Sequence, residues 1–422
     1  MQKREFIKTL ALAGISLPLA AKNTDEIFYK FHNYSVSQMA NDEEFWSTLR
    51  SGFKLKTEYI NLENGYYSMM PQAILNEYIA EIKSLNFHAS FYMRKKMTDD
   101  KIAVRQNLAK YIKCNFNEII VTRNTTEAMN TIINGLDWKT GDEAIMAHQD
   151  YGAMLDMFKQ QAERYGILNK IINIPNHPKS DDEIVALYEN AITKNTKLLM
   201  VCHMINITGQ ILPVRKICDM AHQHNVKVLV DGAHAIAHFN FNITDLNCDF
   251  YASSLHKWLS VPLGAGLLFV KSENIESVWP VNGEYSYDKK DIRKLNHTGT
   301  QPMATELSIA HAIKFNELIG IKRKEERLRY LKNYWVNKVK DFKNIEINTP
   351  FDNERSCGIA NVGVKNMKPA NMAQILFDKY KIWTVAINNP KANVHGCRIT
   401  PGIYTTTEEL NVLVNALKEM SA

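Results

Sequence analysis

Short apolar runs alternate with helix-like runs through the middle of the chain, from about residue 118 to residue 270. The apolar runs predict strands at 118–123, 143–148, 167–174, 197–203, 226–231, 249–253 and 264–270. Apolar residues at helical spacing between them predict helices at 125–135, 151–165, 181–192 and 213–224. This alternation predicts an α/β fold, with a large domain built on a mostly parallel sheet covered by helices.

The pattern changes near residue 292, where a long charged helix is expected over 306–342. Beyond it the sequence predicts strands and helices at 359–364, 369–380, 382–386, 397–399 and 407–420. This series is typical of a smaller α+β C-terminal domain. We expect the large domain at 65–291 and the small domain at 292–422, with 23–64 contributing to the small domain.

The first residues are similar to an export signal. Lys3, Arg4 and Lys8 come before an apolar run of 13 residues, 9–21. This run is shorter than the ~20 residues of a membrane-spanning helix, so it favours a signal segment without a stable membrane span. Residues 3–8 resemble the twin-arginine motif, with lysine in place of the first arginine. We expect residues 1–22 to direct export to the periplasm, the alternative being the amphipathic first helix of a cytoplasmic protein.

Composition narrows the class of protein. The 422 residues are 45% hydrophobic and 23% charged, which excludes fibrous and globally disordered proteins. The net charge of +6 is spread along the chain, and the basic runs 94–96 and 322–324 are interpreted as solvated faces, so no nucleic-acid partner is expected. The 6 cysteines are scattered without a CxxC pair, which predicts free thiols and no metal site.

Four features follow the predicted strands. Thr125 and Thr126 open a helix, where free amides and hydroxyls can bind phosphate. Asp231 ends a strand, where a fixed carboxylate can hold a proton on a ring nitrogen, and Lys257 follows the next strand in apolar surroundings that favour a nucleophilic amine. Arg398 offers a planar fork for a carboxylate. Singly, each is more often a helix cap, a solvated lysine or a surface ion pair; together they match the needs of pyridoxal 5′-phosphate (PLP).

The most specific stretch is 226–270, which contains D-G-A-H, then C-D-F, then S-x-H-K, then G-x-G. With this pattern the chain resembles the class V aminotransferases of PLP fold type I, over about residues 58–418. That group includes isopenicillin N epimerase and the cysteine desulfurases, and the chain is nearest to this branch. The resemblance implies a large PLP-binding domain and a smaller C-terminal domain.

The resemblance also implies how the cofactor ring is held. Lys257 would bind PLP covalently and later move the α-proton of the substrate. Asp231 would keep the ring nitrogen protonated, and His234 would contact the ring hydroxyl. Tyr151 falls where the family places a ring stacked on the cofactor; cysteine desulfurases have histidine there, so tyrosine indicates the epimerase-like branch. Asn206 matches a residue beside cofactor and substrate.

Other roles concern the phosphate, the second subunit and the substrate. The phosphate cup would be formed by Thr125, Thr126, Ser254 and His256. Thr300 matches a residue that reaches the phosphate of the neighbouring subunit, which implies a homodimer with shared active sites. The substrate side would be formed by Arg398, the carboxylate binder, and by Asn64 and Gly65. A further hypothesis, from aromatic and basic content alone, places on that side Phe87, His88, Tyr92 and Arg94.

Several reactions fit these residues. We expect an aminotransferase or epimerase-like enzyme acting on an amino acid or small peptide, with a carbon–sulfur lyase as the rival. A non-catalytic PLP-binding protein is the alternative of another class. A cysteine desulfurase needs a nucleophilic cysteine upstream of the arginine, and segment 387–395 has none, while Cys397 adjoins Arg398 within a predicted strand. The sequence therefore predicts that the chain is not a cysteine desulfurase.

Overall fold

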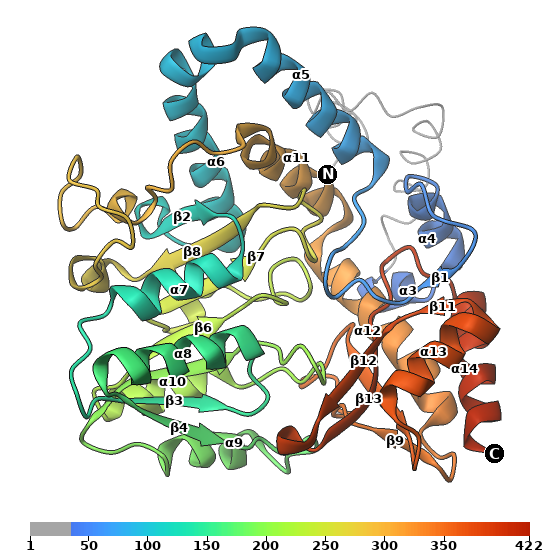
Figure 1. Cartoon of the computed structure of the whole chain (residues 1–422). Helices are drawn as coiled ribbons and strands as arrows, with labels where there is room; N and C mark the ends of the chain where they lie inside the picture. Colours follow the sequence, from blue (N-terminus) through green and yellow to red (C-terminus); the bar gives the residue numbers. More distant parts are fainter. Residues whose placement is uncertain (1–34) are drawn as a thin grey trace.

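The computed structural model describes residues 35–422. The predicted export signal at 1–22 lies outside the described residues. Figure 1 shows two lobes: a large one built on a wide sheet, and a smaller one that contains the C-terminus. Within residues 35–422, none of the helices combines the length and the apolar character needed to cross a membrane.

A seven-stranded sheet forms the centre of the large lobe, in the order β2-β8-β7-β6-β5-β3-β4. Its strands are β2 (Ile119–Thr122), β3 (Glu143–Ala147), β4 (Leu168–Ile172), β5 (Thr196–Cys202), β6 (Lys227–Asp231), β7 (Phe250–Ser254) and β8 (Gly266–Val270). β8 runs antiparallel to both of its neighbours, and the other pairs are parallel. The predicted α/β fold with a mostly parallel sheet is confirmed.

Helices bury both faces of this sheet, as the alternation of apolar residues along each strand requires. Along β6, Val228 and Val230 join one core cluster, whereas Leu229 joins the other. The cluster with Leu229 includes side chains of two helices visible in Figure 1, α7 (Thr125–Gly135) and α8 (Gly152–Tyr165). The opposite cluster is covered by α6 (Met97–Ile112), α9 (Asp181–Glu189) and α10 (Val214–Gln223).

The small lobe has its own sheet and core. Its antiparallel sheet has the order β12-β13-β10-β9, with strands β9 (Ile345–Ile347), β10 (Ala360–Val364), β12 (Val385–Asn389) and β13 (Val394–Ile399). A third apolar cluster lies between this sheet and the helices α12 (Ile321–Val339), α13 (Pro369–Tyr380) and α14 (Thr407–Ser421). The predicted strand–helix–strand series is therefore present.

The N-terminal part of the described chain reaches this small lobe. It contains α3 (Val36–Ala40), α4 (Glu43–Arg50) and β1 (Ile60–Asn61), followed by α5 (Gln72–Lys95). β1 pairs in parallel with β11 (Ile382–Trp383), and an isolated bridge joins Glu63 to Thr400. This pairing brings loop 61–65 next to the end of β13.

The long helix expected over 306–342 is wrong as a single element. The structure has α11 (Met303–Ile319) and α12 in its place, separated by Gly320. The φ of Gly320 is +85°, a conformation that only glycine adopts readily, so the chain turns although the helical spacing of apolar residues continues. α11 packs on α5 and α6, while α12 packs on α3 and α14. The domain boundary at residue 292 stays a prediction.

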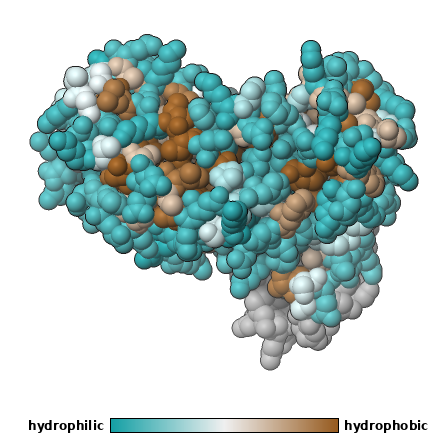
Figure 2. All heavy atoms as spheres, turned by 90° about the horizontal axis from the view of Figure 1, so that it is seen from below, coloured by the Kyte–Doolittle hydropathy of each residue, from teal (hydrophilic) through white to brown (hydrophobic). Residues whose placement is uncertain are grey.

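Apolar side chains also reach the surface in places. Figure 2 shows them as separate patches on a mainly hydrophilic face. Over residues 35–422 the most exposed large apolar side chains include Tyr285, Phe87, Tyr66, Trp279 and Phe91.

Candidate active site

The predicted residues meet at one edge of the large sheet. Asp231 is the last residue of β6, Lys257 follows β7 by a short turn, and Thr125 begins α7 after β2. These three strands run in the same direction, so their carboxyl ends share one edge. In open α/β sheets this is the edge where ligands bind.

Lys257 lies beside a carboxylate and a histidine. Its Nζ is 3.0 Å from Nε2 of His234. Burial lowers the pKa of Lys257 to about 8, although the negative charge of Asp231 opposes that shift. Burial also raises the pKa of Asp231, against the Ala233 N–H that donates to its Oδ1 (3.0 Å) and the charge of Lys257. The site thus holds an amine that loses its proton more easily than an exposed lysine does.

The hydrogen bonds of His234 define the state of that amine. The indole Nε1 of Trp258 is 3.3 Å from Nδ1 of His234, and an indole N–H can only donate. Nδ1 must therefore accept, which places the ring proton on Nε2, because burial holds the pKa of His234 well below its usual value and keeps the ring neutral. Nε2–H then donates to Nζ of Lys257, and this contact favours the neutral, nucleophilic amine.

Trp258 is itself held in place. It is buried, and its ring stacks on His238 with the centroids 3.7 Å apart and the planes at 28°. His238 accepts from the backbone N–H of Gly358 through Nε2 (2.9 Å) and therefore donates through Nδ1 to the carbonyl of His234 (2.8 Å). Sequence reasoning assigned no role to Trp258 or His238, although both lie within the 226–270 stretch that was singled out.

The phosphate side is built on the first turn of α7. The backbone N–H of Thr125 donates to Oγ of Ser254 (3.0 Å), and the two hydroxyl oxygens are 2.7 Å apart. Thr126 is in the same turn and partly exposed, and Asn124 caps the helix by accepting from Glu127 N–H. A helix N-terminus with hydroxyls beside it attracts anions.

Two neighbours complete this corner. His256 contacts the carbonyl of Ala265 through Nδ1 (3.3 Å), and burial lowers its pKa to about 4. Gly266 begins β8 directly behind the turn, and a Cβ there would lie 2.6 Å from Cα of Asn124. The second glycine of the G-x-G pattern is therefore required for the close approach of β8 to the phosphate turn.

Arg398 on β13 is brought in from the small lobe. It is 6% exposed, and its Nη1 donates to the backbone carbonyl of Asn206 (3.2 Å). Glu63 pairs with it: Oε2 accepts from Nε (3.2 Å) and Oε1 from Nη2. Gly65 lies against the guanidinium, since a Cβ at Gly65 would be 3.0 Å from Cζ. Glu63 lies in loop 61–65 next to the predicted Asn64 and Gly65, but sequence reasoning gave it no role.

Asn64 supports this loop rather than exposing its amide. Its Nδ2 donates to the carbonyl of Thr400 (2.8 Å), and its Oδ1 accepts from the hydroxyl of Tyr404 (2.5 Å). The backbone N–H of Gly65 donates to Oγ1 of Thr400 (3.1 Å). Asn64 and Gly65 therefore shape the wall around Arg398.

A second buried carboxyl lies behind the site. Asp150 accepts from the Ala147 N–H (2.7 Å) and from the Cys202 thiol (3.2 Å), and Cys202 is the register partner of Asp231. Burial raises the pKa of Asp150 to about 7. The next residue, Tyr151, is the N-cap residue of α8 and is 47% exposed.

Some predicted residues are not joined to this cluster. Thr300 is exposed, so its contact with a second subunit stays a prediction. Phe87, His88 and Arg94 are exposed on α5, while Tyr92 is buried and donates to Oδ2 of Asp100 (2.7 Å). In the described chain no hydrogen bond or ion pair links these α5 residues to Lys257 or Arg398, and their substrate-side role also stays a prediction.

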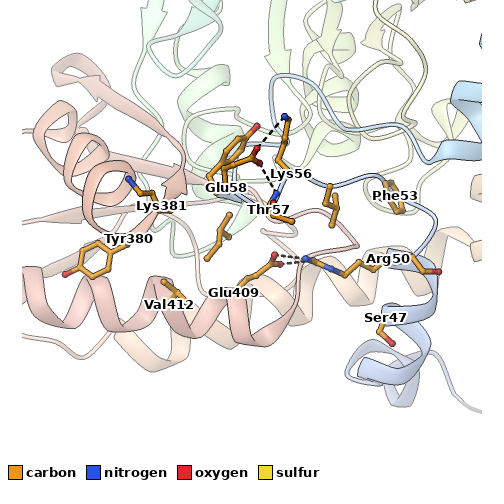
Figure 3. Close-up of a pocket in the computed structure, with 14 residues that line it drawn as sticks. Ser47, Arg50, Phe53, Lys56, Thr57, Glu58, Tyr380, Lys381, Glu409 and Val412 are labelled. Atoms are coloured by element: carbon orange, nitrogen blue, oxygen red, sulfur yellow. Dashed lines mark hydrogen bonds and ion pairs between the residues drawn. The ribbon is translucent and has the colours of Figure 1, made fainter.

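A separate cleft of about 770 Å³ lies between segment 47–60 and the small lobe. Figure 3 shows the bidentate ion pair of Arg50 and Glu409 in this cleft, with Lys56 and Glu58 nearby. Arg50 also donates to the carbonyl of Tyr404 (2.5 Å). None of the predicted site residues lines this cleft. We therefore interpret the cleft as a surface feature between the N-terminal segment and α14, which the ion pair of Arg50 and Glu409 joins.

The cluster around Lys257 fits PLP. Asp231 is only 5% exposed, and among the described residues its second carboxylate oxygen has no hydrogen-bond partner, which leaves an acceptor for a ring N–H. Lys257 supplies the amine and the first turn of α7 supplies the anion site. A family model described as aminotransferase class V matches residues 61–413.

The chain belongs to the class V aminotransferase family. It is 24% identical to isopenicillin N epimerase of Streptomyces clavuligerus over 393 residues, which cover 89% of this chain and 98% of the relative. It is 26% identical to a probable cysteine desulfurase of Halalkalibacterium halodurans over 334 residues, covering 75% and 80%. Its fold matches a cysteine desulfurase from Thermococcus onnurineus NA1 with a TM-score of 0.79 and 22% identity, covering 90% and 98%. The predicted family and fold are confirmed.

PLP is the cofactor of this class V enzyme, as the resemblance implied. When bound, it withdraws electrons from the α-carbon of an attached amino acid. In this chain Lys257, Asp231, Thr125 and Ser254 could hold its aldehyde, ring nitrogen and phosphate ends. The role of each residue toward the cofactor stays a prediction.

Proposed function

We propose that this class V enzyme acts at the α-carbon of an amino acid or small peptide, as an aminotransferase or an epimerase-like enzyme. The observation that supports this best is the buried amine of Lys257, whose pKa is lowered to about 8 and whose Nζ lies 3.0 Å from Nε2 of His234, with Asp231 close enough to affect that pKa. A neutral amine at the ligand edge of the sheet can accept an α-proton and return it.

The chain's own residues divide the work. Asp231 is buried, and its negative charge would balance a positive charge on the ring of the bound cofactor. Arg398, on the other side of the site, orients the substrate carboxylate so that the α-hydrogen faces Lys257. Where the proton is returned then separates transamination from epimerisation.

We also propose that the enzyme is not a cysteine desulfurase. Segment 387–395 contains no cysteine, and Cys397 is buried in β13 with Sγ near the carbonyl of Pro369 (3.7 Å). Burial raises the pKa of the Cys397 thiol to about 12, which opposes formation of a thiolate. The similarity to cysteine desulfurases is as close as that to the epimerases, so the comparisons do not support this exclusion.

The experiment that tests the function is isotope exchange. The holoenzyme is incubated with a panel of amino acids and dipeptides in heavy water, beside a Lys257→Ala variant. We expect deuterium at the α-carbon with the wild type alone, with a keto acid if amino transfer occurs and with inverted configuration if epimerisation occurs. Release of a thiol or sulfide would favour the carbon–sulfur lyase instead. No exchange with any substrate would favour a non-catalytic PLP-binding protein.

Two further proposals concern assembly and location. We propose a homodimer in which Thr300, which is exposed in the single chain, reaches the phosphate side of the partner's site. A Thr300→Ala variant would then lower PLP affinity, and light scattering would report the dimer mass. We also propose export to the periplasm through the Lys3–Lys8 segment, which cell fractionation of the full chain would test.

A further inference from the structure

A buried carboxylate already occupies the arginine assigned to the substrate. Glu63 and Arg398 form a bidentate ion pair in which each side chain is 8% exposed. The carboxylate is fixed by a third donor, the backbone N–H of Tyr66 (2.9 Å from Oε1). A pair with this geometry and burial is a built part of the site rather than a mobile surface contact.

The pair leaves a limited part of the guanidinium for a ligand. Nε and Nη2 donate to Glu63, and Nη1 donates to the carbonyl of Asn206 (3.2 Å). Gly65 covers the guanidinium, since even a Cβ there would lie 3.0 Å from Cζ. A substrate carboxylate must therefore use the remaining N–H groups of Nη1 and Nη2, next to a like-charged neighbour, or displace Glu63.

Both charges also act on the reactive amine. Burial is the main cause that lowers the pKa of Lys257; among the nearby charges, Glu63 raises it and Arg398 lowers it. The ion pair is thus within electrostatic reach of Nζ. A change at Glu63 should be visible both in ligand binding and in the titration of Lys257.

We propose that Glu63 is a specificity-determining residue that competes with the substrate carboxylate for Arg398. This rests on the proposed function, because it requires a substrate that carries a carboxylate. In the free enzyme Glu63 neutralises Arg398 and keeps it in position. During binding the incoming carboxylate shares or takes the guanidinium, so Glu63 weakens the binding of carboxylates relative to neutral ligands of the same shape.

The test compares Glu63→Gln with wild-type holoenzyme, using propionate and the neutral propionamide as probes. Neither probe has an amino group, so binding is measured by calorimetry without turnover. We expect the Kd of propionate to fall about tenfold in Glu63→Gln, because a like charge beside the ligand is removed, while the Kd of propionamide stays the same. Glu58→Gln is the matched control: it removes the same charge from a side chain that is 66% exposed, and should change neither Kd.

The sign of the effect separates the two possible roles. If Glu63 only positions Arg398, Glu63→Gln binds propionate equally or more weakly, and the proposal is wrong. If neither enzyme binds propionate, the carboxylate site itself is wrong and the proposal falls with it. In the absence of ligand, the pKa read from the absorbance of the bound cofactor should be lower in Glu63→Gln than in Glu58→Gln; an equal or higher value contradicts the proposal.

A wild-type measurement remains decisive if Glu63→Gln does not fold. With Glu63 sharing Arg398, wild-type holoenzyme should bind propionate and propionamide within about threefold of each other, whereas a preference for propionate of about 100-fold would refute the competition. These results do not depend on which reaction is catalysed. Failure of the proposed function would show as absent α-deuterium exchange, with the propionate results unaffected.

Discussion

Replacement of Trp258 by phenylalanine isolates one hydrogen bond of the site. Phenylalanine keeps an aromatic ring to stack on His238, whose ring centroid is 3.7 Å from that of Trp258. It lacks the indole N–H that donates to Nδ1 of His234. The proton of His234 is then no longer confined to Nε2. In the other tautomer Nε2 accepts, and it favours the protonated form of Lys257 instead of the neutral one.

The size of the effect follows from the kind of bond that is lost. A buried hydrogen bond between neutral groups contributes about 1 kcal/mol net, and the 3.3 Å separation is long for such a bond, so this figure is an upper value. If all of it acts on the neutral amine, the pKa of Lys257 rises from about 8 by about 0.7 pH unit. The direction is upward because the lost contact stabilised the deprotonated form.

The assay is the pH dependence of amine reactivity in the apoenzyme. Lys257 is acylated with a limiting amount of reagent over a pH series, and the extent at this residue is read by mass spectrometry. Trp279→Phe is the control, because that indole is 65% exposed. An unchanged or lower pKa of Lys257 in Trp258→Phe would refute the assigned tautomer and the neutral amine with it.

Three further changes have defined outcomes. Asp231→Asn should retain PLP but lower kcat by about 100- to 1000-fold in steady-state assays, because a neutral amide cannot balance the ring charge; a loss below tenfold would contradict this. Burial raises the pKa of Asp150 from 3.8 to about 7, so the folded state binds more protons and wild-type stability should fall by up to about 4 kcal/mol as pH rises from 4 to 7; urea unfolding of Asp150→Asn should lack this slope. Gly320→Ala should cost roughly 1–2 kcal/mol in urea unfolding, from its φ of +85° alone since nothing lies within 4 Å of the added Cβ, whereas Gly283→Ala should be nearly neutral.

The sheet was predictable from sequence because its strands are buried on both faces. In β5 and β6 nearly every residue is buried, so the centre of each strand is a continuous apolar run, and the strand ends can be predicted to within one or two residues. The break at Gly320 was missed because apolar spacing continues across it, and one glycine does not reveal its φ. The predicted helix was therefore too long, because the positive φ of Gly320 that ends α11 cannot be inferred from residue type and spacing.

The candidate site was predictable to the extent that its residues are close in sequence. Asp231, His234 and Lys257 lie in one motif, and the structure brings them together. The pairing of Glu63 with Arg398 joins positions 335 residues apart, and it depends on the contact of β1 with β11 that no local pattern shows. The bond of Trp258 to His234 was missed because it depends on side-chain direction rather than on residue type.

The most direct test of the central claim is to find where PLP is attached. Purified holoenzyme is reduced with borohydride, digested and mapped by mass spectrometry, beside Lys257→Ala and Lys324→Ala; Lys324 is a second buried lysine, whose amine donates to the carbonyl of Trp258. We expect a phosphopyridoxyl group on Lys257 in the wild type and in Lys324→Ala, and none in Lys257→Ala. Attachment at another lysine, or an unlabelled wild type in the presence of excess PLP, would contradict it.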